Sequence, residues 1–410
     1  MYVNAPTTVC WLIINIVPYH HARALALAAH LPMQVSLIQL TDVDMVKSLP
    51  GETGDAIPYR SETLFPGVPW SGIDQGDLSS RLYERLDALK PAVVCLNGWS
   101  EGGSATALRW CLANRVPAVV FSDSAAIDMP RVPWREWVKR RIVNLCSAAL
   151  VAGTPHAEYL SDLGFPKERI FLGYDVVDNR HFEAGADMAR LQGTALRQRL
   201  GLPKRYFLAS ARFVEKKNLS GLLHAYAAYR RATPNDPWSL VVLGDGELRP
   251  ELTRLRSELG LDDAVSFPGY RSYQELPAYY GLASCFVHAS TTEQWGLVVN
   301  EAMAAGLPVL VSNRCGCAAN LVQEDGVQEG GNGFAFDPMR PDELASLMSR
   351  MSEPGRDLPS MGRRSRAIIG HWSPETFAEG LENAIVCALG NPVPKATAIE
   401  HALLWIMRGR

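Results

Sequence analysis

The chain has 410 residues, of which 47% are hydrophobic and 20% are charged, a composition typical of a globular protein that is too long for one core and therefore has two domains. Its 40 Lys and Arg residues are matched by 43 Asp and Glu residues, so no excess of positive charge is available to recruit nucleic acid. The longest apolar run near the start, residues 9–17, is too short to cross a bilayer and follows no basic residue, so we expect neither a signal peptide nor a membrane span.

The first half of the chain alternates short β-rich runs with helical patterns. The β-rich runs are residues 9–16, 34–40, 92–97, 118–123 and 148–153, and the helical patterns include residues 22–31 and 79–90. This alternation predicts βαβ units on a parallel sheet. Residues 50–76 are rich in Pro and Gly, and we expect a long loop there, at the rim of a binding cleft.

The second half repeats the alternation after a polar stretch at residues 183–205. Its β-rich runs are residues 206–213, 238–245, 264–269, 285–290, 308–313 and 333–338, and its helical patterns include residues 218–232 and 342–352. This order predicts a second parallel sheet of similar size.

We therefore predict an α/β protein with two doubly wound, Rossmann-like domains that face a cleft. The first domain is expected at residues 1–182 and is completed by helices at about 373–410, a linker is expected at 183–204, and the second domain at 205–372. Ligands of such sheets bind at the carboxyl ends of the strands. The eight cysteines lie mostly in apolar segments, as reduced thiols do, and this favours a cytoplasmic protein.

Two cations follow the first strand of the second domain. The run YFLASARF ends at Arg212, and Lys217 stands just before a helix that is expected to begin near Asn218. A helix amino terminus after a strand favours an anion, and two cations add full charges, so a diphosphate fits. The alternative is a solvated charged turn, because Glu215 and Lys216 precede Lys217 directly.

Two carboxylates stand in the otherwise apolar or small stretch TTEQWGLVVNEAMAAGLPV. Glu293 precedes Gly296, and Glu301 lies in the first turns of the helix that follows. Buried carboxylates need partners, and a carboxylate takes two hydrogen bonds from a vicinal diol. Two diols on either side of a diphosphate describe a nucleotide sugar. Gly244, in GDG after a strand, either lets a ligand approach the sheet or forms an ordinary tight turn.

These motifs together resemble the family-4 glycosyltransferases of the GT-B fold. The resemblance covers nearly all of residues 206–377 and rests on ARFVEKKN, VVLGDGEL, VSFPGY, the run from Glu293 through EAMAAGLPV, and GGNGFAFDP, which follow the order and spacing of the family. It implies that Arg212 and Lys217 hold the donor diphosphate, that Glu293 reaches the hydroxyls of the transferred sugar, and that Glu301 binds the ribose diol.

The resemblance also implies two regions that border the donor. The main chain of Trp295, Gly296 and Leu297 is expected to line the sugar and phosphates, and the loop that contains Tyr270 and Arg271 is expected to border the base. Trp295 stands where the family more often has Phe or Tyr.

The N-terminal half resembles the family only in architecture. The loop after its first strand, residues 15–23, has no glycine, and His20, His21 and Arg23 are candidate donors to phosphate or acceptor; the alternative is that the histidines are ordinary loop residues. Asp123, at the end of a strand, is a candidate contact to the sugar or acceptor, or else caps a helix.

The implied activity is transfer of a hexose-type sugar from a UDP- or GDP-linked donor to the hydroxyl of a sugar or lipid-linked acceptor, with retention, in polysaccharide, glycolipid or glycoconjugate synthesis. We expect no metal: Asp42-Val43-Asp44 matches the Asp-x-Asp of metal-dependent transferases, but short patterns arise by chance. A GT-B nucleotide-sugar epimerase and a non-catalytic sugar-nucleotide binder are the alternatives.

The segment RVPWREWVKRRIV, residues 131–143, carries five cations and two tryptophans, and the chain ends HALLWIMRGR. Such segments suit the headgroup layer of an anionic membrane, which would place the protein at the inner face of the cytoplasmic membrane. The alternative, which we favour from sequence, is that Trp134 and Trp137 pack into the first domain and that the C-terminal segment docks as a closing helix.

Overall fold

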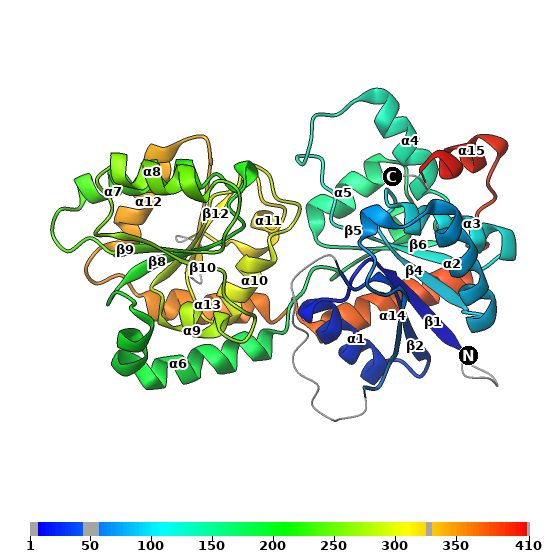
Figure 1. Ribbon diagram of the computed structural model, residues 1–410, viewed down its shortest axis with the longest axis horizontal. Coiled ribbons are helices and arrows are strands. Elements are labelled where there is room, and N and C mark those ends of the chain that lie inside the picture. The colour runs from blue at the N-terminus through cyan, green and yellow to red at the C-terminus, as the bar shows by residue number, and fades with distance from the viewer. Residues whose placement is uncertain (1–6, 44–56, 325–329, 408–410) are drawn as a thin grey trace. The chain divides into compact units, whose positions relative to one another are not determined.

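The computed structural model describes residues 7–43, 57–324 and 330–407. The chain forms two compact units (Figure 1). The first contains Met1–Val176 and Pro374–Arg410, and the second contains Val177–Ser373. Among the described residues, no helix is both long and apolar enough to cross a membrane.

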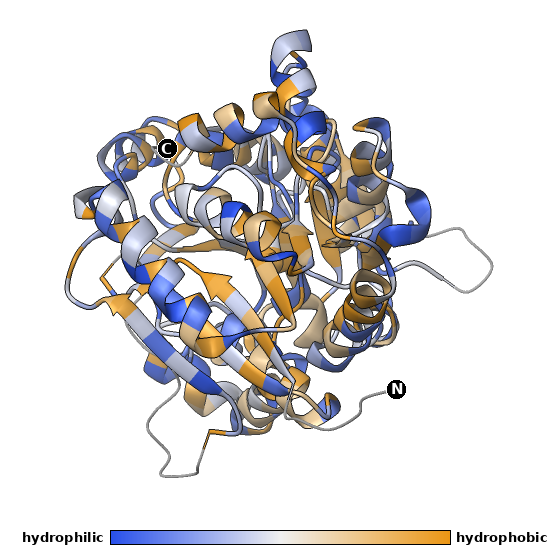
Figure 2. Cartoon of the chain, turned by 90° about the vertical axis from the view of Figure 1, so that its right-hand side faces the viewer, coloured by the Kyte–Doolittle hydropathy of each residue, from blue (hydrophilic) through white to orange (hydrophobic). Residues whose placement is uncertain are grey.

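The first unit is built on a seven-stranded parallel sheet with the order β3-β2-β1-β4-β5-β6-β7. Its strands are β1 (Thr8–Ile13), β2 (Gln34–Thr41), β3 (Arg60–Phe65), β4 (Val93–Asn97), β5 (Ala118–Ser122), β6 (Ala148–Val151) and β7 (Ile170–Leu172). The central strands are almost continuously apolar and buried, as strands covered on both faces must be; Figure 2 shows their hydrophobic colouring. The predicted parallel sheet is confirmed.

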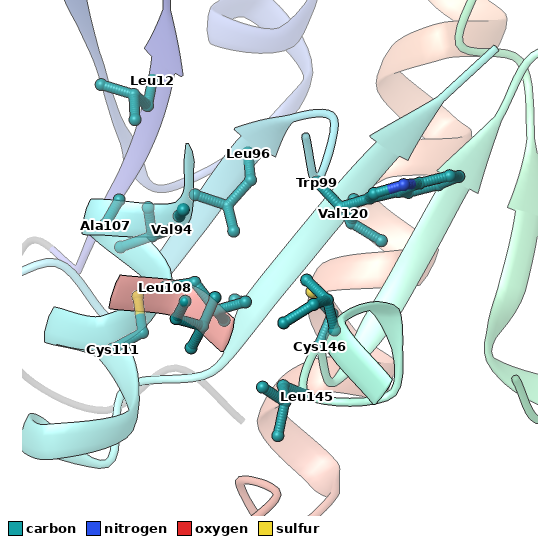
Figure 3. Close-up of a cluster of buried hydrophobic side chains, with 14 of the residues drawn as sticks. Leu12, Val94, Leu96, Trp99, Ala107, Leu108, Cys111, Val120, Leu145 and Cys146 are labelled. Atoms are coloured by element: carbon teal, nitrogen blue, oxygen red, sulfur yellow. The ribbon is translucent and has the colours of Figure 1, made fainter. Parts of the chain in front are cut away.

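Helices cover both faces of this sheet. They are α1 (Pro18–His30), α2 (Gln75–Leu89), α3 (Gly102–Asn114), α4 (Pro133–Val143), α5 (Thr154–Asp162), α14 (Pro374–Gly390) and α15 (Ala398–Met407). One core lies against α2, α3 and α15 and includes Leu12, Leu96 and Leu108 (Figure 3). On the other face Phe377 of α14 packs near Trp11 of β1, with ring centroids 5.5 Å apart. The returning chain therefore completes the first unit.

The expected loop at residues 50–76 is only partly a loop, and the part at 50–56 lies outside the described residues. Residues 60–65 form the edge strand β3, paired in parallel with β2, and the short 3₁₀ helix η1 (Trp70–Gly72) follows. The prediction missed β3 because it is an edge strand, which pairs with one neighbouring strand only and can therefore carry exposed polar residues. Here the strand begins with the exposed Arg60 and Ser61.

The second unit has a six-stranded parallel sheet with the order β10-β9-β8-β11-β12-β13. Its strands are β8 (Tyr206–Ser210), β9 (Ser239–Leu243), β10 (Val265–Gly269), β11 (Cys285–His288), β12 (Val309–Ser312) and β13 (Gly333–Phe336). Each lies within a predicted β-rich run, and the second parallel sheet is confirmed.

The helices of the second unit are α6 (Asn179–Leu200), α7 (Leu219–Ala232), α8 (Arg249–Glu258), α9 (Leu276–Leu282), α10 (Leu297–Ala304), α11 (Ala318–Leu321), α12 (Pro341–Ser352) and α13 (Leu358–Ile369). Short 3₁₀ helices η2 (Lys167–Arg169), in the first unit, and η3 (Glu215–Lys217) complete the element order.

Most of residues 183–204, where we expected a linker, belong to α6 and thus to the second unit. Asp178 caps this helix by accepting a hydrogen bond from the His181 N–H at 3.1 Å. Phe182 is fully buried and packs edge-on against Tyr280 of α9 at 5.8 Å. The exposed positions of the helix are mostly polar or charged, although Met188 and Leu191 are exposed as well, and this composition explains why the segment reads as a polar linker.

Candidate functional site

The loop after β8 carries the two predicted phosphate-binding cations. Backbone hydrogen bonds fix it against the loop after β9, from the Ala211 N–H to the Leu243 carbonyl at 3.1 Å and from the Phe213 N–H to the Asp245 carbonyl at 2.8 Å. Gly244 makes this packing possible, because its φ is +114° and a Cβ there would lie 1.9 Å from the Ala211 carbonyl oxygen. The structural role of Gly244 is therefore to admit the loop that presents Arg212.

The two cations differ in their surroundings. Arg212 is exposed, whereas the side chain of Lys217 is only 12% exposed. The turn that holds Lys217 is fixed by the Thr291 N–H, which donates to the Lys216 carbonyl at 2.9 Å, and by Asn218, whose side-chain amide donates to the Ala289 carbonyl at 3.2 Å. The loops after β8 and β11 are thereby joined at the carboxyl end of the sheet.

Lys217 forms an ion pair with Glu293, the first of the two predicted carboxylates. The same carboxylate oxygen, Oε2, lies 3.5 Å from His288 Nε2 and 3.3 Å from Ser290 Oγ. Burial by itself would raise the pKa of Glu293, but the hydrogen bond with His288 and the charge of Lys217 outweigh it and hold the pKa well below its usual range. Glu293 is therefore an anion with several fixed partners.

His288 and Ser290 are functional candidates that the sequence reasoning missed. His288 is the last residue of β11 and is 3% exposed, and burial lowers the pKa of its imidazole. A neutral His288 can donate a hydrogen bond to Glu293 without adding charge. The available signal was a histidine at the end of an apolar strand five residues before Glu293.

Helix α10 begins beside this cluster. Gly296 precedes it with φ +104°, and a Cβ at this position would lie 3.5 Å from Glu293 Cγ and 3.7 Å from His288 Nε2. The first N–H groups of a helix have no carbonyl partner within it and favour an anion, as does the helix dipole. The α10 amino terminus, which starts at Leu297, and Lys217 thus both lie beside Glu293.

Trp295 is 2% exposed, and its indole N–H donates to Asn300 Oδ1 at 2.9 Å. Its side chain therefore anchors the loop to α10 and is not free to stack on a ligand. Contact of the main chain of residues 295–297 with sugar or phosphate stays a prediction.

Glu301, the second carboxylate, has a different environment. The Tyr280 hydroxyl donates to its Oε2 at 2.7 Å. Burial raises the pKa of Glu301 to about 7, and the Tyr280 hydrogen bond offsets only part of the effect. Glu301 is thus held by Tyr280 through one carboxylate oxygen and titrates near neutral pH. Tyr280, on α9, is a second neighbour that spacing in the sequence did not indicate.

The loop after β10 contains the residues expected to border the base. Tyr270 is 54% exposed, and Arg271 donates through Nε to the Tyr279 hydroxyl at 2.5 Å and through Nη1 to the Tyr270 carbonyl at 3.0 Å. An exposed ring beside a fixed guanidinium is able to contact a planar base. That contact stays a prediction.

Arg23, a predicted ligand contact, has a structural position in the first unit. Its side chain is fully buried and donates to the Val176 carbonyl at 2.9 and 3.1 Å and to Asp175 Oδ1 at 3.2 Å. The guanidinium also lies 4.9 Å from the centres of the Tyr19 and Tyr174 rings. These contacts fix α1 to the last residues of the first unit, and the contact of Arg23 with phosphate or acceptor stays a prediction.

The two histidines beside Arg23 also have partners within the first unit. His20 is 6% exposed, its Nδ1 lies 3.1 Å from the Asn15 carbonyl, and burial lowers the pKa of its imidazole well below the usual value. His21 Nδ1 lies 2.7 Å from the Tyr59 hydroxyl. Of the three predicted donors, His21 keeps the most accessible side chain.

Asp123 follows directly after β5. It caps no helix, because the next helix, α4, starts at Pro133. Burial, and next the charge of Asp175, raise the pKa of Asp123 to about 7. Glu101, before α3, has a pKa raised to about 7 by burial and by Asp123. The carboxyl edge of the first sheet therefore has two neighbouring carboxyl groups that titrate near neutral pH, of which the sequence indicated one.

The Asp-x-Asp pattern is only half described. Asp42 accepts a hydrogen bond from the Gly67 N–H at 2.7 Å, and Asp44 lies outside the described residues. Elsewhere in the described chain, no group of three or more His, Cys, Asp and Glu side chains is placed to hold a metal ion.

The folds and the site define a protein of the GT-B class, in which two doubly wound parallel-sheet domains follow one another. The solved structure of HepE from Anabaena in complex with UDP has this fold: it aligns with a TM-score of 0.71 at 18% identity over 93% of this chain and 100% of that one. Residues 194–367, which lie within the second unit, match the family model described as glycosyl transferases group 1. The resemblance to GT-B glycosyltransferases that the motifs indicated is confirmed, whereas the assignment to family 4 stays a prediction.

Two curated relatives show how far the similarity extends. The alpha-monoglucosyldiacylglycerol synthase of Acholeplasma laidlawii is 27% identical over 193 residues, which are 47% of this chain and 46% of the relative. The mannosylfructose-phosphate synthase of Agrobacterium fabrum is 27% identical over 255 residues, which are 58% of this chain and 54% of the relative. The chain spans about half the length of these relatives.

Proposed function

We propose that the chain is a glycosyltransferase that moves a hexose-type sugar from a nucleotide diphosphate sugar to an acceptor hydroxyl. The observation that carries this proposal is the contact of Lys217 with Glu293 beside the amino terminus of α10. These groups supply a cation and a helix terminus for a diphosphate, and a carboxylate for sugar hydroxyls, at one strand edge.

The charges suggest how transfer proceeds. The bond between the anomeric carbon and the diphosphate oxygen breaks, and its electron pair leaves with the diphosphate. Arg212, Lys217 and the α10 amino terminus stabilise that negative charge, which is largest in the transition state. The acceptor oxygen then bonds to the anomeric carbon, and the departing diphosphate takes its proton. The resemblance to family 4 supports retention of configuration.

The proposal includes no metal cofactor. Lys217 and Arg212 supply the positive charge that a divalent ion supplies in metal-dependent transferases, and two fixed cations with a helix terminus are sufficient to hold a diphosphate.

The acceptor is proposed to be a sugar or a lipid-linked molecule at the inner face of the cytoplasmic membrane. The name of the Acholeplasma relative includes diacylglycerol, which supports a lipid-linked acceptor, and the UDP in the HepE complex supports a uridine nucleotide as the first donor to examine. GDP-linked donors are the alternative. With such an acceptor, the product would belong to polysaccharide, glycolipid or glycoconjugate synthesis.

A hydrolysis screen of the purified protein tests the proposal. UDP- and GDP-linked sugars are incubated without acceptor, and release of UDP or GDP is measured. We expect slow release from one donor that depends on Glu293. Tight donor binding with neither hydrolysis nor transfer to any sugar or lipid acceptor would make the chain a binding protein. Conversion of the donor sugar to an epimer would make it an epimerase.

A further inference from the structure

The first unit exposes large apolar side chains on two neighbouring helices. On α4, Trp134 is 59% exposed and Trp137 is 45% exposed; on α15, Trp405 is 55% exposed and Ile406 is 58% exposed. The expectation that Trp134 and Trp137 pack into the domain is therefore wrong. Single exposed apolar residues are common, but three exposed tryptophans on two adjacent elements require an explanation.

The orientation of α15 is fixed by its inner face. Glu400, Leu404 and Met407 are buried at helical spacing, and α15 contacts α3 and α4. Arg141 of α4 forms an ion pair with Glu400 at 2.5 Å. The opposite face of α15 carries the exposed Ile399, Trp405 and Ile406, and α15 itself lies next to α4 (Figure 1).

The docking surface is defined here as Trp134, Arg135, Trp137, Arg140, Lys395, Ile399, Trp405 and Ile406, all of them exposed. A cation and an aromatic ring lie next to each other on this surface, since the Arg135 guanidinium is 5.4 Å from the Trp134 ring centre. Arg141, beneath the surface, lies 4.6 Å from the Trp137 ring. Arg140, Arg141 and Lys395 line one surface hollow of about 410 Å³.

This mixture fits the headgroup layer of an anionic membrane. Indole rings prefer the boundary between hydrocarbon and headgroups, and Arg and Lys side chains extend from apolar surroundings to lipid phosphates. Two carboxylates, Glu136 and the exposed Asp162, line a hollow together with Trp137 and Arg140. The three exposed cations of the surface outnumber the one exposed carboxylate, so the net charge complements an anionic leaflet. A protein partner would bury the cations, which requires matched carboxylates.

We propose that the exposed faces of α4 and α15 form a docking surface for an anionic lipid bilayer. The inference extends the proposed membrane location and rests on it. Binding to vesicles is measured without any sugar transfer, so this proposal and the proposed function fail separately.

Sedimentation with vesicles tests the surface. The full chain is mixed with vesicles of phosphatidylcholine alone or with phosphatidylglycerol at about one third of the lipid. We expect binding only to the anionic vesicles, weakening as salt rises from about 0.1 M to 1 M, because the screening length falls from about 10 Å to about 3 Å. Equal binding to both vesicles, or no pelleting at low salt, would overturn the proposal.

Variants locate the surface. Arg135→Glu with Lys395→Glu is expected to weaken vesicle binding by about twenty-five-fold or more, since each surface cation accounts for about fivefold. Trp134→Ala with Trp405→Ala is expected to weaken it by a similar factor. Matched controls in the second unit are Arg254→Glu, whose side chain is 71% exposed, and Leu191→Ala, which is 82% exposed.

The vesicle binding of the surface variants and of the controls decides between the possible occupants of the surface. Loss of binding in the surface variants but not in the controls, with an unchanged thermal transition, supports the proposal. Unchanged binding in both surface double variants overturns it. A dimer in lipid-free solution that the Trp134 and Trp405 variant converts to a monomer would assign the surface to a second copy of the chain and also overturns it.

Discussion

The ammonium of Lys217 contacts the carboxylate of Glu293, so two residues predicted to hold different parts of one donor are paired with each other. In the proposed reaction, a diphosphate competes with Glu293 for Lys217, and the carboxylate loses one partner as the donor binds. His288 and Ser290 stay beside Glu293. They can keep it ionised and in place when Lys217 turns to phosphate.

Lys217→Ala is expected to lower the rate of donor cleavage by about two to three orders of magnitude, because a single electrostatic donor at a departing group is worth about 3 to 4 kcal/mol. Arg212→Ala is expected to have an effect in the same direction, and smaller because its side chain is exposed. Turnover with a fixed donor is the measurement. Lys216→Ala is the matched control, and a loss there as large as at Lys217 would contradict a specific phosphate contact.

His288→Leu is expected to lower kcat about ten- to hundredfold, since a hydrogen bond to a charged group contributes about 1.5 to 3 kcal/mol. His288→Gln keeps an N–H donor and should recover much of that loss. The pKa of Glu293 is depressed in the folded protein, so its carboxylate is lost only at low pH. Removing His288 raises this pKa, and the acid limb of the pH profile should move to higher pH in the Leu variant alone. Identical profiles for both variants would leave His288 a packing residue.

Glu301 gives the donor affinity a pH dependence. Its pKa is raised to about 7 by burial, so the carboxylate that accepts from a ribose diol is mostly protonated below that pH and ionised above it. We expect the apparent Kd for the nucleoside diphosphate to fall as pH rises through about 7. Glu301→Gln should bind more weakly and lose this dependence. Calorimetric titration at several pH values measures it, and the same pH dependence in the Gln variant would assign the effect to another group.

The strands of the second unit were predictable because central parallel strands are short, continuous apolar runs; the run at residues 285–290 contains β11. The cluster at its end was predictable in part. Glu293 and Lys217 are recognisable in the sequence as charged residues. His288 is recognisable as their partner only in the folded chain, where the loop at Gly296 packs beside the end of β11.

Pairings between distant residues were not predictable. Arg23 looked like a ligand donor at a strand end, yet its carboxylate partner, Asp175, is 152 residues away in the sequence. The exposure of Trp137 was not predictable either, because its spacing in the sequence is the same whether the side chain packs inward or faces outward. Spacing identifies chemistry along one element, whereas burial and pairing depend on the elements packed against it.

Activity is expected to persist in EDTA. The charges of Lys217 and Arg212 are fixed to the chain, so chelation removes nothing that stabilises the diphosphate. Donor hydrolysis is measured after dialysis against EDTA and again with added manganese or magnesium. Loss in EDTA with recovery on addition of either ion would contradict the proposal of a metal-independent transferase and would direct attention to Asp42 and Asp44.

Arg23→Met is expected to destabilise the first unit by about 3 to 5 kcal/mol, because it leaves the buried Asp175 without its ionic partner. The double variant Arg23→Met with Asp175→Asn should recover part of this loss, since no buried charge then lacks a partner. Stability is measured by urea unfolding, and the apparent Kd for the nucleoside diphosphate should stay unchanged in the folded single variant because the residues proposed to bind it lie in the second unit. A variant of normal stability that binds the nucleotide weakly would return Arg23 to the role of a ligand contact.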